Sequence, residues 1–190
     1  MIRLTAPDPA RFESWAACVR DFADGPIDGS GYFGGSIPEP TPEEFARYLE
    51  QRLAEGDTSI PPAPERVHCS YRWIVDETWE AGGPLLGFLA VRHHLTSFLL
   101  AQGGHIGYSV RPSARRRGVA GAALAVGLTE AAELGIDPVL VCCAETNEAS
   151  RRTIERNGGV YESSIAEHRR YWFGQGPWPQ EPDAQGALGR

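Results

Sequence analysis

Residues 104–121, Gly-His-Ile-Gly-Tyr-Ser-Val-Arg-Pro-Ser-Ala-Arg-Arg-Arg-Gly-Val-Ala-Gly, have the pattern of a strand, a turn and the start of a helix. Apolar side chains alternate with small or polar ones in the first part, which is the period of a strand. These apolar residues are Ile106, Tyr108 and Val110. Pro112 ends the strand because proline has no N–H to donate. A basic turn follows at 113–117, and an apolar helix begins directly after Gly118.

A turn rich in arginine and glycine that leads into a helix is typical of an anion site. The first N–H groups of a helix have no partners within it, and the helix dipole places partial positive charge there. Gly118 and Gly121 have no Cβ, so a ligand can approach the backbone closely. The alternative is a solvated turn, since runs of like charge usually face water. Neither a Walker loop nor a Rossmann fingerprint matches. We interpret the turn as a cradle for a pyrophosphate.

Length and composition fit one globular domain. The chain has 190 residues, of which 42% are hydrophobic. We expect a single domain over residues 1–174 and a disordered tail over 175–190, where prolines and glycines are frequent. No apolar run approaches the roughly 20 residues that span a bilayer, and no secretory signal is expected at the N-terminus. These features predict a protein without membrane partners.

Net charge and cysteine spacing limit which binding partners and metals the chain is expected to have. The net charge of −7 argues against nucleic acid. The four cysteines show no C-x-x-C spacing, which predicts reduced thiols, a cytoplasmic location and no metal site. His93 and His94 are adjacent but have no acidic or sulfur partner at ligand spacing, so we do not assign them to a metal.

Hydrophobic periodicity predicts an α/β fold with a mixed sheet. Strand and helix alternate in the middle of the chain, which implies parallel pairing there and antiparallel pairs at the flanks. The expected strands are 2–6, 68–75, 85–91, 106–110, 138–144, 160–165 and 169–173. The expected helices are 9–22, 41–56, 118–134 and 148–156, with a helical turn at 96–101.

The glycine-rich loop at 24–40 has an aromatic tip, Tyr32 and Phe33. Long loops in compact domains often carry function, so this loop is a candidate wall of a substrate site. A disordered connector is the other interpretation, and the sequence leaves both open.

Three segments resemble the GNAT superfamily of N-acetyltransferases, and the first is the strand 106–112, Ile-Gly-Tyr-Ser-Val-Arg-Pro. The loop 115–120, Arg-Arg-Arg-Gly-Val-Ala, is similar to the family signature Arg/Gln-x-x-Gly-x-Gly/Ala. Residues 147–150, Asn-Glu-Ala-Ser, followed by 157–159, Asn-Gly-Gly, are similar to its second cofactor segment. The resemblance covers about 85–173 and extends to a bacterial subgroup of predicted acetyltransferases. It implies a mixed, mainly antiparallel twisted sheet, flanked by helices, with a central parallel pair splayed at the cofactor site.

The resemblance also implies a cofactor site for acetyl-CoA. Backbone N–H groups of the basic turn would hold the pyrophosphate, and the Val110 N–H would face the thioester carbonyl. Asn147 and Ser150 would line the pantetheine arm, although Asn147 is also a good helix cap. The implied cofactor residues are Tyr108, Val110, Arg115, Arg116, Arg117, Gly118, Val119, Ala120, Gly121, Asn147 and Ser150.

The implied reaction is transfer of acetyl from acetyl-CoA to a primary amine on a small molecule or peptide, by direct attack on the thioester. An amine with a pKa of ~10.4 is mostly protonated at neutral pH, so a base is needed. Glu145, after a buried strand, is the first candidate, although a solvated loop acid is its plain alternative. Tyr108 is the next candidate, with His105 and Tyr171 after it.

One position departs from the family pattern. Many members have a tyrosine that protonates the CoA thiolate, and Ile154 occupies its place. A thiol has a pKa of ~8.5, so the thiolate leaves readily without such an acid. The departure nevertheless keeps a second function open, a non-catalytic acyl-CoA-binding sensory or regulatory module. The acceptor and the oligomeric state stay open, and an exposed edge strand would permit a homodimer.

Overall fold

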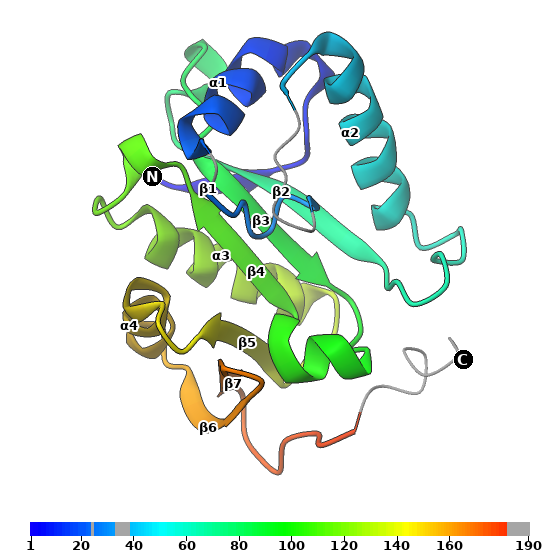
Figure 1. Cartoon of the computed structure of the whole chain (residues 1–190), viewed down its shortest axis with the longest axis vertical. Helices are drawn as coiled ribbons and strands as arrows, with labels where there is room; N and C mark the ends of the chain where they lie inside the picture. The colour runs from blue at the N-terminus through cyan, green and yellow to red at the C-terminus, as the bar shows by residue number, and fades with distance from the viewer. Residues whose placement is uncertain (24, 33–38, 182–190) are drawn as a thin grey trace.

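The computed structural model describes residues 1–23, 25–32 and 39–181, and within them one mixed sheet forms the centre of the fold (Figure 1). Its strand order is β1-β2-β3-β4-β5-β7-β6, with seven strands in the described residues. Among the strands of the described residues, β4 and β5 are the one pair that runs parallel. The strands are β1 (Arg3–Thr5), β2 (Cys69–Val75), β3 (Gly87–Arg92), β4 (Ile106–Val110), β5 (Val139–Ala144), β6 (Val160–Ile165) and β7 (His168–Phe173). The predicted mixed sheet with one central parallel pair is confirmed.

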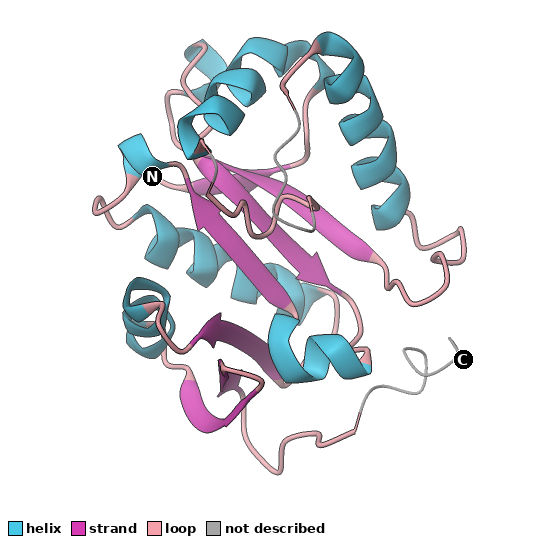
Figure 2. Cartoon of the chain, in the orientation of Figure 1, coloured by secondary structure: helices cyan, strands magenta, loops and turns pink. Residues whose placement is uncertain are grey.

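Helices cover both faces of the sheet (Figure 2). The α-helices are α1 (Phe12–Phe22), α2 (Pro42–Gly56), α3 (Val119–Glu133) and α4 (Glu148–Arg156). Short helical segments are η1 (Pro9–Arg11), η2 (Trp79–Ala81), η3 (Leu99–Gly103) and η4 (Pro112–Ala114). α1 and α2 pack an aromatic cluster against Trp73 and Phe88 on one face. α3 and α4 pack against Leu89 and Ile106 on the other.

Side-chain caps begin two of the four α-helices in the described residues. The Thr41 hydroxyl accepts the N–H of Glu44 at 3.2 Å and begins α2 as a side-chain cap. The Asn147 side chain accepts the N–H of Ser150 at 3.0 Å and begins α4 in the same way. Gly118 begins α3 with no side chain to offer, and this leaves the first N–H groups of α3 without a side-chain cap.

The parallel pair is held together at one end only. β4 and β5 have a single register pair, Ile106 with Val141, whereas β5 and β7 have six. Just before that pair, the His105 N–H donates to the Leu140 carbonyl at 2.7 Å, and the Leu140 N–H donates to Nδ1 of His105 at 2.9 Å. Beyond Val141 the two strands diverge, which opens the sheet between the C-terminal ends of β4 and β5.

Two short segments can be compared with the sequence expectation. The helical turn expected at 96–101 is present at 97–103, where it ends as the π-helical segment η3. Part of the tail expected to be disordered has a defined place, because Trp178 stacks on Trp172 with ring centroids 6.3 Å apart. Residues 182–190 of that tail lie outside the described residues, as do 24 and 33–38 of the glycine-rich loop. In the described part of the chain, no helix is long and apolar enough to cross a membrane.

Candidate active site

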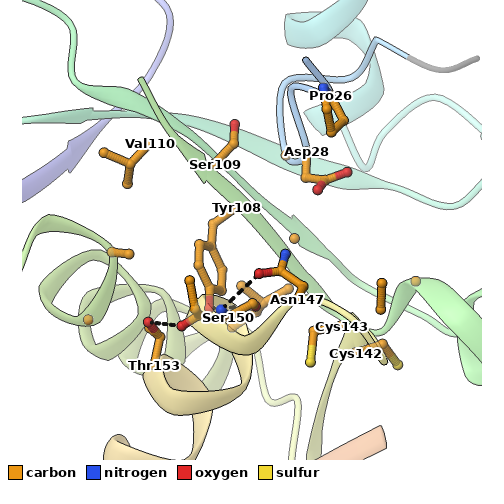
Figure 3. A pocket seen from close by; sticks show the side chains of 18 of the residues that line it. Pro26, Asp28, Tyr108, Ser109, Val110, Cys142, Cys143, Asn147, Ser150 and Thr153 are labelled. Atoms are coloured by element: carbon orange, nitrogen blue, oxygen red, sulfur yellow. Dashed lines mark hydrogen bonds between the residues drawn. The ribbon is translucent and has the colours of Figure 1, made fainter. Parts of the chain in front are cut away.

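A cleft of about 1120 Å³ opens where β4 and β5 diverge. Its walls come from the loop before α2, from β4 and the basic turn, and from β5 with the start of α4. Figure 3 shows Asp28, Tyr108, Asn147 and Ser150 around this cleft. Of the predicted site residues, those that line it are Tyr108, Val110, Arg115, Arg116, Gly118, Val119, Ala120, Gly121, Asn147 and Ser150. The structure therefore brings ten predicted positions together around one space.

The basic turn adopts a backbone that presents N–H groups to the cleft. Arg116 and Gly118 have positive φ angles of 58° and 76°. A Cβ added to Gly118 would meet no protein atom within 4 Å, so the space beside it is open to a ligand. The uncapped N–H groups of α3 begin here, and with the helix dipole they favour an anion. Arg117 differs from the expectation, since it is exposed and lies outside the cleft.

Arg115 has a structural role besides its charge. Its Nε donates to the Val110 carbonyl at 2.9 Å and so ties the turn to the end of β4. Together with Arg116, it adds positive charge at the mouth of the cleft near the α3 N-terminus. The geometry fits a pyrophosphate because backbone donors, a helix dipole and two guanidinium groups converge.

β4 directs two backbone N–H groups into the gap. The N–H of Arg111 donates to the Leu86 carbonyl and the N–H of Arg92 donates to the His105 carbonyl. Because antiparallel ladders alternate, the N–H groups of Tyr108 and Val110 point away from β3, toward the diverging β5. This position suits a donor to a ligand carbonyl between the strands.

The side chains of Tyr108 and Ser150 meet across the cleft. Their hydroxyl oxygens are 3.0 Å apart. Burial raises the pKa of Tyr108 to about 12, so its hydroxyl keeps its proton at neutral pH. Asn147 caps α4 and lines the cleft at once, which agrees with both interpretations of this residue. Ile154, in contrast, is fully buried in the core and contributes nothing to the cleft.

Glu145 is not where the sequence led us to expect it. It lies outside the cleft, and its carboxylate pairs with Nε of Arg169 at 2.7 Å and accepts the Ser164 hydroxyl. The Ser164 hydrogen bond and the Arg169 charge lower the pKa of Glu145, which makes it a weaker base. The partners come from the β6–β7 hairpin, which pairs beside β5. The two further candidates are structural: Tyr171 is buried and donates to Glu155, and His105 joins β4 to β5.

Sequence reasoning missed four charged residues that line the cleft, which are Asp28, Arg92, Arg152 and Arg156. Asp28 lies in the described part of the glycine-rich loop, together with Pro26 and Tyr32, which also line the cleft. Its carboxyl is open to the cleft, but the concave walls limit its hydration. Desolvation raises the pKa of Asp28, although Arg92 and His168 oppose that shift. The sequence signals for this wall were the length and glycine content of the loop and its aromatic tip.

The described residues include no group of His, Cys, Asp or Glu that could hold a metal ion. All four cysteines are free thiols. Parallel strands that diverge beside an uncapped helix N-terminus, with donors aimed into the gap, fit the class of protein that the GNAT resemblance implies, a CoA-dependent acyltransferase.

The comparisons agree with this class. The family model "Acetyltransferase (GNAT) domain" matches residues 5–160, and the chain belongs to this family. It is therefore an acetyl-CoA-dependent N-acetyltransferase, which transfers an acetyl group to an amine. No curated protein sequence matches the chain.

Solved structures share the fold at low sequence identity. The chain is similar to RimL, a ribosomal L7/L12 alpha-N-protein acetyltransferase in complex with coenzyme A, with a TM-score of 0.61, 15% identity and coverage of 90% of this chain and 93% of that one. It is similar to the microcin C7 self-immunity acetyltransferase MccE in complex with acetyl-CoA and AMP, with a TM-score of 0.62, 14% identity and 92% coverage of both chains. It is also similar to an acetyltransferase from Salmonella typhimurium that modifies the N-terminal serine of the 50S ribosomal subunit protein L7/L12. The TM-score is 0.60 and the identity 15%, with coverage of 92% of this chain and 95% of that one.

Proposed function

We propose that the cleft between β4 and β5 is the site where this chain transfers acetyl from acetyl-CoA to a primary amine. The observation that carries the proposal is the divergence of the two parallel strands directly beside the uncapped start of α3. The amine nitrogen forms a bond to the thioester carbonyl carbon, the carbon–sulfur bond breaks, and the thiolate leaves. When bound, acetyl-CoA supplies the activated acyl group.

Each wall of the cleft has a separate task in this proposal. The N–H groups from Arg116 to Gly121, together with Arg115, bind the pyrophosphate. Asn147 and Ser150 line the pantetheine arm. The Val110 N–H donates to the thioester carbonyl oxygen, where negative charge develops during attack.

We assign proton donation toward the leaving sulfur to the Tyr108 hydroxyl. It lies on the cleft wall, contacts Ser150 and keeps its proton because its pKa is raised to about 12. This hydroxyl takes over the task that the residue at Ile154 cannot perform, because Ile154 has no donor and is buried. A thiolate needs little help to leave, so a donor at this position assists the reaction without controlling it.

Thermal unfolding and thiol release test the assignment together. CoA at 100 times its Kd stabilises a binding protein by ~2.7 kcal/mol. Each kcal/mol raises the Tm of a chain of this size by roughly 2–4 °C. We expect such a shift with CoA, and free thiol release from acetyl-CoA when a suitable amine is added. An unchanged Tm with CoA would rule out the cleft as a cofactor site. A raised Tm without turnover of any amine would favour the sensory or regulatory module.

The setting of the reaction is part of the proposal. Four free thiols support a reducing, cytoplasmic location. The strand β6 forms one edge of the sheet and exposes Val160, Tyr161 and Ile165, which supports a homodimer through this edge. Sedimentation of the parent protein and of Tyr161→Lys checks the dimer, because a lysine at the edge would dissociate it.

A further inference from the structure

The end of the cleft away from the basic turn carries polar groups that the cofactor proposal does not use. Its walls are formed by Asp28 and Tyr32 from the loop before α2, Tyr71 from β2, Arg92 from β3 and His168 from β7. Both signs of charge are therefore present at one end of a single space. This end is where an acceptor would meet the acetyl group.

A contact between two glycine residues holds Asp28 in place. Gly29 has a φ of 80°, and a Cβ on it would lie 2.4 Å from the Gly107 carbonyl oxygen on β4. The loop backbone therefore packs directly on the strand. On the other side of this contact, Arg52 donates to the Gly31 carbonyl at 2.7 Å, and the buried Ser30 hydroxyl donates to the Ile27 carbonyl. Asp28 thus projects from a fixed segment of loop.

Arg92 is fixed beside the same glycine. Its Nη1 donates to the carbonyls of Gly103 and Gly104 at 2.8 and 3.0 Å. A Cβ on Gly107 would lie 3.0 Å from its Nη2, so the guanidinium rests against the bare backbone of β4. Gly107 is therefore the point around which Asp28 and Arg92 are both placed.

Neither of these charges has an ion-pair partner in the described ranges 1–23, 25–32 and 39–181. No carboxylate of these ranges pairs with Arg92, and no cation of them pairs with Asp28. The two side chains influence each other electrostatically without forming a salt bridge. Asp28 is exposed and Arg92 is half-buried, so a ligand in the cleft can reach both charges.

We propose that the acceptor is a small molecule with both an amine and a carboxylate, whose ammonium group binds Asp28 and whose carboxylate binds Arg92. This inference rests on the proposed function and names its substrate class. Asp28 takes the proton from the ammonium group, and the freed amine attacks the thioester. Nη1 of Arg92 donates to the Gly103 and Gly104 carbonyls, so the Nη2 and Nε donors remain to form two parallel hydrogen bonds with a carboxylate.

The remainder of such an acceptor has room. A second cavity of about 610 Å³ shares three wall residues with the cleft, Tyr71, Arg92 and Phe98. Arg92 stands at the boundary of the two spaces. An acceptor with its carboxylate at Arg92 can therefore extend its side chain past the aromatic residues into the second cavity.

The experiment compares matched acids and amides as acceptors. Free thiol release is measured with acetyl-CoA and glycine, β-alanine, γ-aminobutyrate and the L-amino acids, each beside its carboxamide. The proteins are the parent, Arg92→Gln, Asp28→Asn, and two controls that remove an exposed charge of the same sign, Arg20→Gln and Glu133→Gln. Calorimetric titration of each acid into the CoA-saturated proteins gives a readout that does not need turnover.

We expect at least one acid to have a kcat/KM about ten- to a hundredfold above that of its amide. Arg92→Gln should bring this ratio close to one, mainly by raising KM for the acid. Asp28→Asn should lower kcat for acids and amides alike, and the controls should match the parent.

The outcomes separate this inference from the proposed function. Equal use of acids and amides by the parent protein, or an acid preference that survives Arg92→Gln, overturns the inference while transfer itself stands. Turnover of acceptors that lack a carboxylate, with no binding of any amino acid, also overturns the inference and leaves the proposed transfer intact. Binding of an acid that depends on Arg92, with no thiol released by any acceptor, keeps the acceptor site and overturns the transfer. No binding and no turnover of any acid overturns the inference outright.

Discussion

The hydroxyl of Tyr108 lies 3.0 Å from the Ser150 hydroxyl and joins β4 to the first turn of α4 across the cleft. Ser150 is itself held by the Asn147 cap, since its N–H donates to the Asn147 side chain at 3.0 Å. The cap therefore fixes the position of Ser150 in the first turn of α4, and the Ser150 hydroxyl in turn orients the Tyr108 side chain. A proton donor thus reaches the cleft from the strand, whereas the helix position of Ile154 is buried in the core.

Replacement of Tyr108 by phenylalanine tests this donor. Tyr108→Phe should lower kcat by about tenfold, which is less than the usual loss for a proton donor because the thiolate is a good leaving group. CoA affinity should change by less than about threefold, since the ring stays in place. Tyr161→Phe, on the exposed edge strand β6, is the matched control and should retain the parent kcat. A Tyr108→Phe enzyme with the parent kcat would exclude the hydroxyl from the chemistry.

The sequence predicted the fold closely because its strongest signals are local. The bounds of α4 and β6 coincide with the expected 148–156 and 160–165. A cap at Asn147 and the turn 157–159 confine this helix within a few residues, and neither depends on distant contacts. The basic turn was predictable for the same reason, since strand, arginines and helix start are contiguous in the chain.

The charged groups of the cleft were not predictable in this way. Asp28 and Arg92 are far apart in sequence, and the packing of Gly29 on Gly107 brings them to one space. Glu145 is the reverse case, a residue that the sequence placed at the site and the structure places outside it. It follows a buried strand as expected, but the strand order places β7 next to β5, so that Arg169 captures its carboxylate. A pairing between strands that are not consecutive leaves no local signal.

Gly118 should be the position of the turn that is most sensitive to a side chain. Gly118→Ala and Gly135→Ala form a matched pair, because both glycines have a φ of 76° and neither Cβ would meet a protein atom within 4 Å. Each change should therefore cost a similar stability, about 1 kcal/mol. Only Gly118→Ala should weaken CoA binding, by about tenfold or more, because the new methyl group conflicts with the ligand. Calorimetry with CoA measures this, and equal affinities for the two variants would place the pyrophosphate elsewhere.

Asp28 and Glu145 are rival bases with opposite pKa shifts. Desolvation raises the pKa of Asp28, while hydrogen bonding from Ser164 lowers that of Glu145. A raised pKa means that the base is protonated, and inactive, up to a higher pH. The acid limb of kcat/KM should therefore fall above the usual aspartate range and disappear in Asp28→Asn, with kcat lowered by about a hundredfold. Glu145→Gln should keep both the limb and the rate. If Glu145→Gln instead lost the acid limb and the rate while Asp28→Asn kept both, Glu145 would be the general base.

The ion pair of Asp21 with Arg111 should make the free energy of unfolding depend on pH in the acidic range. Asp21 on α1 accepts Nε of Arg111 at 2.6 Å and the N–H and hydroxyl of Ser113 at the start of the basic turn. Burial alone would raise the pKa of Asp21, but the bonds from Arg111 and Ser113 outweigh it and lower the pKa below the usual 3.8. A lowered folded pKa means that this stabilisation is complete above pH ~3.8 and is lost as the pH falls through the folded value.

At neutral pH, Asp21→Asn should therefore reduce the free energy of unfolding by about 1–3 kcal/mol, because charged hydrogen bonds in a partly buried site are replaced by neutral ones. Each kcal/mol corresponds to a Tm decrease of roughly 2–4 °C for a chain of this size. The difference between parent and variant should shrink below pH ~3.8, as Asp21 becomes protonated in the parent. Glu13→Gln, an exposed acid on the same helix, controls for the loss of charge alone. Denaturant titrations from pH 2 to 7 measure the effect, and a parent–variant difference that stays constant over that range would show that the carboxylate charge contributes nothing.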